Sequence, residues 1–151
     1  MRKKRLPPIE GGVGRNSVYV DTSAWIAFFS ARDQYHAEAE RLFRDVVARN
    51  GILTTTNLVL AEVHRLILRR VGVAAAALAL NRIVSSARTA VVFASEAHHA
   101  AAVAWLRRLS SHRVTYTDAT GFAVIEDTGC AWYISFDADF LLTGFRPWTP
   151  A

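Results

Sequence analysis

Short apolar runs alternate with longer helix-forming segments along almost the whole chain, and this alternation constrains the fold more than any other feature. Runs rich in β-branched and aromatic residues are predicted to form strands, and the segments between them are predicted to form helices. Such alternation is typical of an α/β protein with a mainly parallel sheet. Strands are expected at 17–20, 52–55, 89–93, 131–135 and, at the sheet edge, 146–148; helices are expected at 22–30, 33–49, 57–70, 73–86, 95–109 and 118–127, with a short helical turn near Phe140.

The composition favours one compact domain, residues 17–151, preceded by a basic tail, residues 1–16. The chain has 151 residues and 52% of them are hydrophobic, which is enough to bury a core. The net charge is +5, and five of the basic residues fall within the first 15 positions. This tail either contacts nucleic-acid phosphates or is a plain extension of the domain.

Cysteine content and hydropathy point to the cytoplasm. Cys130 is the only cysteine, so an internal disulfide is excluded, as is common in a reducing compartment. We expect Cys130 to be a small buried apolar residue. No apolar run reaches the about 18 residues that a membrane-spanning helix needs, so we predict a cytoplasmic protein without a membrane partner.

Two carboxylates directly follow predicted strands. Asp21 comes after the strand at 17–20, and Asp137 comes after the apolar run that ends at Phe136. A carboxylate in such a position is costly to bury unless its charge is compensated. In open parallel sheets, ligands bind beyond the carboxyl ends of the strands, where the strand order reverses. We therefore expect Asp21 and Asp137 to lie in a functional site.

Three further acids are candidates for the same site. Asp118 starts a predicted helix, where the helix dipole tolerates a negative charge; Glu62 lies inside another helix and reaches the site only if that helix crosses the pocket; Asp139 lies two residues after Asp137. Taken singly, these acids also suit a helix cap, a solvated helix residue and a turn. Acids that meet repel one another, and Mg²⁺ or Mn²⁺, which prefers hard oxygen ligands, removes the repulsion. The set predicts a metal-dependent hydrolytic site.

Four segments resemble, in order, the motifs of PIN-domain ribonucleases. They are VDTSAWIA at 20–27, TTTNLVLAEV at 54–63, TYTDA at 115–119 and ISFDADF at 134–140. The last segment has Ser135 where that family more often has threonine. Each motif is weak alone, but four in this order span residues 18 to about 145, nearly the whole predicted domain.

This resemblance implies a three-layer α/β/α sandwich with a mainly parallel central sheet and the acids in one groove. It implies one or two Mg²⁺ or Mn²⁺ ions held by Asp21, Glu62, Asp118 and Asp137, with Asp139 as a further ligand, and hydrolysis of RNA phosphodiester bonds. The size and motif set look most like the toxin of a bacterial VapBC (type II) toxin–antitoxin pair. The implied partners are a cognate antitoxin protein, a second copy of the chain in a homodimer, and a tRNA, rRNA or mRNA substrate.

Nearby polar residues are predicted to support these acids. Thr22 and Ser23 are placed to steady Asp21 or a metal-bound water, and Thr115 is placed to steady Asp118; ordinary caps and turns explain the same hydroxyls equally well. Arg65 and Arg69 follow Glu62 by three and seven residues along the helix, so they are candidates for binding RNA phosphates.

Two other functions fit part of the pattern. Asp137 and Asp139 after a strand also resemble the first motif of haloacid-dehalogenase-type phosphatases, but Leu141 stands where that motif has threonine or valine, and only 12 residues follow Asp139. The other alternative is a PIN-like module that binds RNA or protein without cutting. The intact set of acids disfavours this second alternative.

Overall fold

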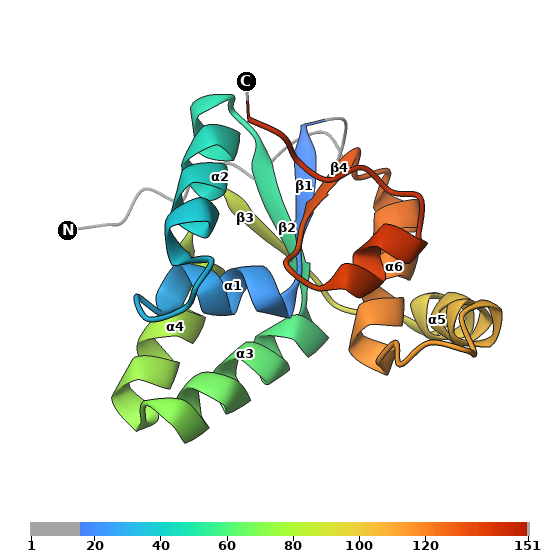
Figure 1. Cartoon of the computed structure of the whole chain (residues 1–151), viewed down its shortest axis with the longest axis horizontal. Coiled ribbons are helices and arrows are strands. Elements are labelled where there is room, and N and C mark those ends of the chain that lie inside the picture. Colours follow the sequence, from blue (N-terminus) through green and yellow to red (C-terminus); the bar gives the residue numbers. More distant parts are fainter. Residues whose placement is uncertain (1–15, 151) are drawn as a thin grey trace.

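Four parallel strands form the centre of the structure, a computed structural model that describes residues 16–150 (Figure 1). The strand order is β3-β2-β1-β4, so the first strand of the chain lies inside the sheet. The strands are β1 (Ser17–Val20), β2 (Ile52–Thr56), β3 (Thr89–Val92) and β4 (Trp132–Ile134). They lie where the apolar runs predicted them.

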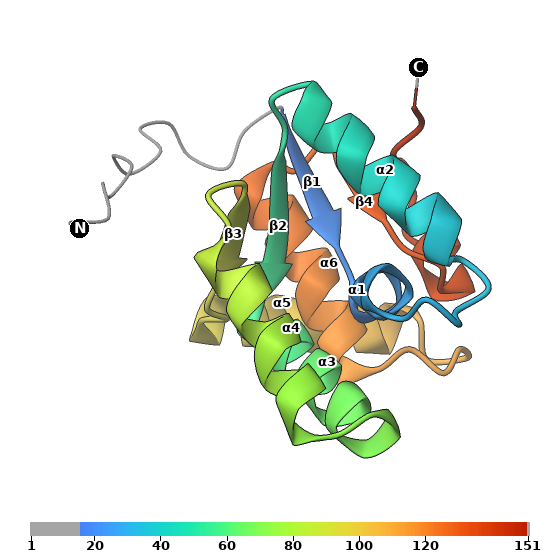
Figure 2. The same ribbon diagram turned by 90° about the vertical axis from the view of Figure 1, so that its left-hand side faces the viewer.

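Helices cover both faces of this sheet. Figure 2 shows α2 and α4 in front of the strands and α5 and α6 behind them, so the predicted three-layer α/β/α sandwich is confirmed. The helices are α1 (Thr22–Phe29), α2 (His36–Ala48), α3 (Asn57–Arg70), α4 (Val73–Ser85), α5 (Glu96–Arg108) and α6 (Tyr116–Thr128), followed by the 3₁₀ helix η1 (Ala138–Leu142).

The strand order reverses between β1 and β4. The chain moves outward from β1 to β2 and β3, then crosses through α5 and α6 to pair β4 with the other side of β1. Val20 is in register with Ile134, and the backbone N–H of Asp21 donates to the Ile134 carbonyl at 3.3 Å. The residues that follow β1 and β4 therefore emerge side by side, as expected for a ligand site in an open parallel sheet.

Some local details differ from the sequence prediction. In the sequence, Asn57 suits a helix cap, but Thr56 caps α3 by accepting from the N–H of Val59 at 3.2 Å, and the Asn57 side chain accepts from the N–H of Ala94 at 2.9 Å. The predicted edge strand at 146–148 is reduced to a single bridge between Tyr133 and Pro147. Tyr133 donates to the Arg146 carbonyl and accepts from the N–H of Trp148, and Pro150, at the next donor position, has no N–H to extend the ladder.

Three further predictions concern the basic tail, membrane-spanning helices and Cys130. The basic tail lies outside the described residues, except for Asn16. Within residues 16–150, no helix has the length and apolar character required to cross a membrane. Cys130 is 8% exposed, as expected of a small buried residue.

Tyr19 connects the sheet to α6 and η1 in the core. Its side chain is fully buried and stacks on the ring of Phe140. Phe140 also packs edge-to-face against Phe122, with 5.0 Å between the ring centroids. Gly121 of α6 lies directly against the Tyr19 ring, and a Cβ atom there would overlap the hydroxyl group. Glycine at this position therefore lets α6, which carries Asp118, pack closely on the strand that precedes Asp21.

We expect Gly121→Ala to lower the free energy of unfolding by about 1–3 kcal/mol, the usual cost of overpacking a core. This would occur although alanine favours helices over glycine by about 1 kcal/mol. Urea unfolding followed by circular dichroism measures the change. Tyr19→Phe is the control. It removes a buried hydroxyl that has no hydrogen-bond partner among the described residues, so alone it should leave the free energy of unfolding unchanged. Combined with Gly121→Ala, it should restore part of the lost stability. Equal stability of Gly121→Ala and the original chain would contradict this packing.

Candidate active site

Asp21 lies at the reversal of strand order and is held by hydrogen bonds from both sides of it. It is 3% exposed and caps α1 by accepting from the N–H of Ala24 at 3.1 Å. Ser23 Oγ donates to Asp21 Oδ1 at 2.8 Å, and Ser135 Oγ, from the segment after β4, donates to Oδ2 at 2.8 Å. These bonds fix the carboxylate in one orientation.

The same two serines position Asp137. The N–H of Asp137 donates to Ser135 Oγ at 3.0 Å, and the N–H of Phe136 donates to Ser23 Oγ at 2.9 Å. Asp137 then starts η1, where its Oδ1 accepts from the N–H of Asp139 at 2.9 Å. Ser23 thus contacts Asp21 as the sequence predicted, whereas Ser135 is a supporting residue that the sequence analysis noted without assigning it a role.

Glu62 reaches the site from the helix α3. Thr22 Oγ1, at the first position of α1, donates to Glu62 Oε2 at 2.7 Å. Thr22 therefore orients Glu62, a partner different from the Asp21 or metal-bound water predicted from the sequence. The bond ties α3 to the beginning of α1, next to Asp21.

Asp118 lies in the first turn of α6, where it forms a capping box with Thr115. Its N–H donates to Thr115 Oγ1 at 3.1 Å, and its Oδ2 accepts from the N–H of Thr115 at 3.4 Å. Thr115 thus holds Asp118 in the way the sequence suggested. One carboxylate oxygen from each of Asp118, Asp137 and Asp139 lies within 4.8 Å of the others. Such a group of hard oxygen donors suits a divalent cation.

All four principal acids line one pocket of about 370 Å³, although they come from four separate elements. The lining residues include Asp21, Glu62, Asp118 and Asp137. Asp139 is not part of the lining, but it belongs to the carboxylate cluster beside it. The structure thus brings together the five acids singled out from the sequence.

Burial makes two of these acids, Asp21 and Asp118, hard to ionise without a cation. Burial raises the pKa of Asp21 to about 7, from an ordinary value of 3.8, against the opposing effect of its hydrogen bonds. Burial also raises the pKa of Asp118 to about 6, and the negative charges of Asp137 and Glu62 act in the same direction. A divalent cation would favour the ionised acids and relieve their repulsion, so the donor set fits Mg²⁺ or Mn²⁺.

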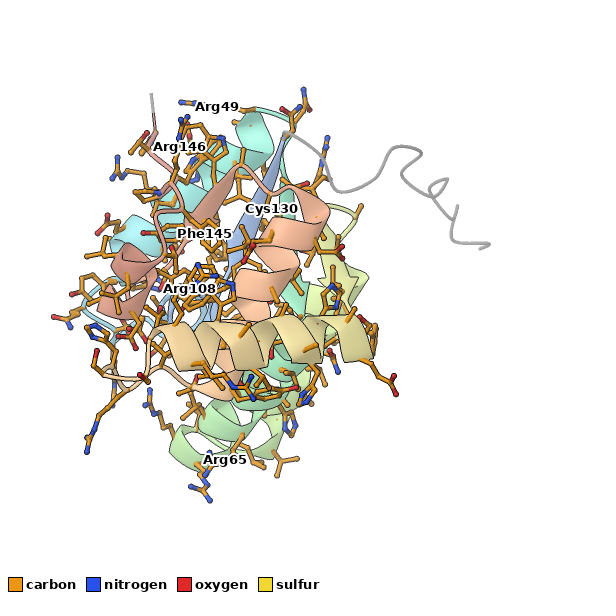
Figure 3. All side chains as sticks on the ribbon, turned by 90° about the vertical axis from the view of Figure 1, so that its right-hand side faces the viewer. Arg49, Arg65, Arg108, Cys130, Phe145 and Arg146 are labelled. Atoms are coloured by element: carbon orange, nitrogen blue, oxygen red, sulfur yellow. The ribbon has the colours of Figure 1, made fainter. Side chains whose placement is uncertain are left out.

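The pocket has an arginine other than the two predicted ones. Leu66 and Arg70, four and eight residues after Glu62, line the pocket. Arg65 and Arg69 are exposed but are not among the lining residues, and Figure 3 shows Arg65 projecting away from the body of the protein. The 3.6-residue helical period carries the pocket face through positions 62, 66 and 70.

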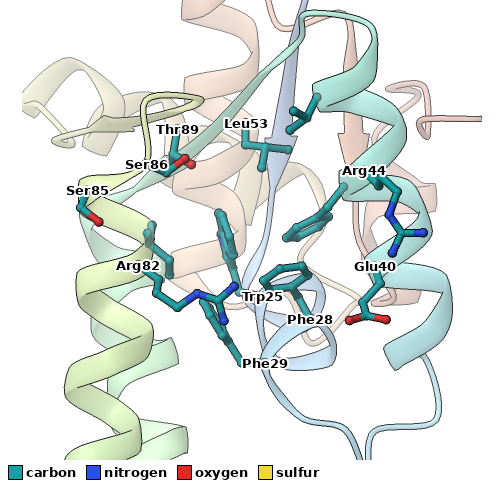
Figure 4. Close-up of a pocket in the computed structure, with 13 residues that line it drawn as sticks. Trp25, Phe28, Phe29, Glu40, Arg44, Leu53, Arg82, Ser85, Ser86 and Thr89 are labelled. Atoms are coloured by element: carbon teal, nitrogen blue, oxygen red, sulfur yellow. The ribbon is translucent and has the colours of Figure 1, made fainter. Parts of the chain in front are cut away.

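A larger cavity, of about 570 Å³, lies away from the acids between α1, α2 and α4 (Figure 4). Aromatic side chains dominate its wall, and the Arg82 guanidinium lies over the rings of Phe28 and Phe29. Among the described residues, Glu40 is the only carboxylate in its wall. This cavity lacks the converging acids of the smaller pocket, so we place the chemistry in the smaller one.

The fold and the converging acids define a PIN-domain protein. The PIN domain family matches residues 18–145, and the chain belongs to this family. A curated relative is the 23S rRNA-specific endonuclease VapC20 of Mycobacterium tuberculosis, which is 34% identical over 132 residues, covering 85% of this chain and 95% of the relative.

Two solved structures resemble this fold. The crystal structure of M. tuberculosis VapC20, described as a sarcin–ricin loop cleaving toxin, has a TM-score of 0.79 and 33% identity, and the match covers 88% of this chain and 99% of that one. VapBC2 from Rickettsia felis, solved with a DNA fragment from its promoter, has a TM-score of 0.63 and 12% identity over 89% of this chain and 98% of that chain. At 12% identity, the second match shows the fold alone.

The raised pKa values predict how stability depends on pH. The folded chain binds protons at Asp21 and Asp118 more tightly than the unfolded chain does, so in EDTA the melting temperature should fall as pH rises from 5 to 8. Mn²⁺ should raise the melting temperature more at pH 8 than at pH 5, because it replaces protons.

Thermal melts of the original chain and Asp21→Asn test this expectation. Asparagine has nearly the same shape and still accepts from the N–H of Ala24, but it cannot ionise. The variant should lose most of the pH slope and most of the Mn²⁺ effect. A melting temperature that stays flat or rises with pH in EDTA would show that these acids are not held in their protonated form.

Proposed function

We propose that the protein is a metal-dependent endoribonuclease that hydrolyses RNA phosphodiester bonds and acts as the toxin of a type II toxin–antitoxin pair. The observation that carries this proposal is the convergence of four acids from four elements in one pocket. Membership of the PIN family and 34% identity to an rRNA-specific endonuclease support it.

Mg²⁺ or Mn²⁺ would be held by Asp21, Glu62, Asp118 and Asp137, with Asp139 beside them. A bound divalent ion polarises a phosphate and makes water more acidic, which is the chemistry that phosphodiester hydrolysis requires. The chain's own contribution is position. Ser23 and Ser135 fix Asp21, Thr22 fixes Glu62, and Thr115 fixes Asp118 by the bonds described above. The ligands are thus preorganised, so little reorganisation is needed when substrate binds.

An rRNA loop is our first choice of substrate among tRNA, rRNA and mRNA. The relative VapC20 is named as specific for 23S rRNA and as cleaving the sarcin–ricin loop. Proteins that recognise RNA by sequence usually bind single-stranded loops, whose bases are free to turn outward. The open pocket, with exposed Arg70 in its wall, suits such a loop.

RNA cleavage with purified protein tests the proposed activity. With Mg²⁺ or Mn²⁺, the chain should cut a hairpin RNA that carries the sarcin–ricin loop, and EDTA should abolish cutting. Asp21→Asn and Asp118→Asn should each lower the rate about 100-fold or more, because a catalytic metal is worth several kcal/mol. The exposed acid Glu96 on α5 provides a matched control, and Glu96→Gln should keep the original rate.

Total cellular RNA should be tested in parallel, because it also contains tRNA and mRNA. Cleavage of tRNA or mRNA alone would support the proposed ribonuclease activity but contradict an rRNA loop as the substrate. RNA that is retained but never cut, with either metal, would establish the alternative of a non-catalytic binding module.

We also propose two protein partners, a cognate antitoxin and a second copy of the chain. A tail of the antitoxin with a basic residue would complement the acidic pocket. For the homodimer, α3 and α4 offer an apolar surface, since Val71 is 72% exposed and Leu78 is 60% exposed. Both line a hollow of about 200 Å³ between α1, α3 and α4. Exposed apolar surface of this kind is typical of protein contacts.

Leu78→Asp should convert the dimer into a monomer. A charge at this position would have to be buried in the dimer, whereas in the monomer the side chain is already largely in water. Light scattering coupled to size-exclusion chromatography measures the mass. Val73→Asp is a matched control, because Val73 is 76% exposed but does not line the hollow. A monomeric mass for the original chain would contradict the proposed homodimer. Loss of the dimer in Val73→Asp but not in Leu78→Asp would show that the contact lies on another part of α4.

A further inference from the structure

One part of the acidic pocket's wall is aromatic. Tyr35, from the loop between α1 and α2, and Phe136, which directly precedes Asp137, both line the pocket. Their rings are parallel within 1°, and the ring centroids are 4.5 Å apart. Phe136 packs on the core, while Tyr35 lies over it and remains 39% exposed. A flat aromatic surface is thus presented beside the acids.

Both rings are held in place by backbone contacts. The N–H of Phe136 donates to Ser23 Oγ at 2.9 Å, and Ser23 in turn donates to Asp21. The N–H of Tyr35 donates to the Asp33 side chain at 2.8 Å, and the Tyr35 carbonyl accepts from the first turn of α2. The pair is therefore preorganised, and a ligand that stacks on it need not order a loop.

The Tyr35 hydroxyl is not needed to hold this arrangement. No hydrogen bond within residues 16–150 uses it, and Tyr35 is 39% exposed, so the hydroxyl does not need a partner from the protein. What Tyr35 adds to the pocket is therefore mainly its ring face. Among the described residues, no salt bridge joins an arginine to Asp21, Glu62, Asp118 or Asp137, so the surroundings of the acids are free of paired cations.

We propose that Tyr35, supported by Phe136, is a stacking site for an unpaired nucleobase of the substrate next to the phosphate that is cut. This inference rests on the proposed ribonuclease function and names a further binding residue for it. A nucleobase is the part of RNA that combines a flat π surface with no charge, so it can approach carboxylates that repel phosphates. Aromatic stacking accepts any base and contributes about 1–3 kcal/mol per base. Phe136 directly precedes Asp137, and both line the pocket, so a base stacked on this pair would lie beside the reacting phosphate.

The test measures RNA binding separately from cutting. The probe is the sarcin–ricin loop hairpin with 2-aminopurine in the loop, titrated in EDTA so that no chemistry occurs. Stacking quenches 2-aminopurine fluorescence, and quenching is expected with the original chain at one or more loop positions. Tyr35→Ala should weaken binding about 5- to 150-fold, which corresponds to about 1–3 kcal/mol, and should remove the quenching. Tyr35→Phe and Tyr35→Trp should keep both.

Two controls separate stacking from a purely structural role. Tyr35→Leu keeps an apolar contact over Phe136 but has no π face, so it should bind as weakly as the alanine variant while melting at the original temperature. Phe93, 74% exposed and outside the pocket lining, is the matched aromatic control, and Phe93→Ala should bind normally. Binding by Tyr35→Leu and Tyr35→Ala within two-fold of the original chain would overturn the proposal.

The outcome remains informative if the nuclease function fails. A chain that never cuts RNA but loses binding and quenching in Tyr35→Ala would keep the stacking site and remove the enzyme. A chain that cuts RNA, with a KM unchanged by Tyr35→Ala and Tyr35→Leu, would keep the enzyme and remove the stacking site. Failure of the original chain to bind either the hairpin or an unstructured 12-nucleotide RNA would overturn the stacking site as well.

Discussion

The hydrogen-bonded burial of Asp21 is the constraint on which the rest of the site depends. This carboxylate is 3% exposed, and its partners come from α1 and from the segment after β4. The bonds from α1 are local, but the bond from Ser135 exists only because β1 and β4 are neighbours, which requires the chain to cross the sheet after β3. Ser135, which donates to Asp21, also accepts a hydrogen bond from the N–H of Asp137. Sheet topology and site geometry are therefore one arrangement.

Such a site costs stability in the absence of a cation. Burial raises the pKa of both Asp21 and Asp118, so the folded chain favours their neutral forms, whereas catalysis by a metal requires the ionised forms. Short hydroxyl side chains at the ends of strands and helices reduce that cost by donating to the carboxylates. Glu62 and Asp118 lie in helices, and Asp21 and Asp137 cap the helices that follow them, so each of these like charges has a fixed place in the site.

The sequence predicts the fold well because each element has a local cause. The strands are short runs of apolar and β-branched residues. The helices α1, α5 and α6 begin at side-chain caps, Asp21, Ser95 and Thr115, and α6 ends at Gly129. Asp21 and Asp137 are recognisable because each follows an apolar run. Glu62 and Asp118 do not follow an apolar run. Taken singly they also suit a solvated helix residue and a helix cap, and the order of four family motifs strengthened their connection to the site.

Two pocket residues could not be found in this way. Arg70 was missed in favour of Arg65 and Arg69 because the phase of a helix face depends on how α3 packs, which its own sequence does not determine. The contact of Tyr35 with Phe136 joins segments far apart in the chain. A lone tyrosine before a helix has no signal that distinguishes a pocket wall from an ordinary surface position.

The mixed character of the pocket follows from the problem that its substrate poses. RNA is a polyanion, and its phosphates are repelled by a cluster of carboxylates until a cation is bound. An arginine placed against those acids would pair with them and compete with the metal, and none does so within residues 16–150. An attraction to RNA that does not depend on positive charge can act closer to the acids than an arginine could. An aromatic surface supplies such attraction through the base, while Arg70, exposed at the pocket wall, is available to the backbone phosphates farther along the strand.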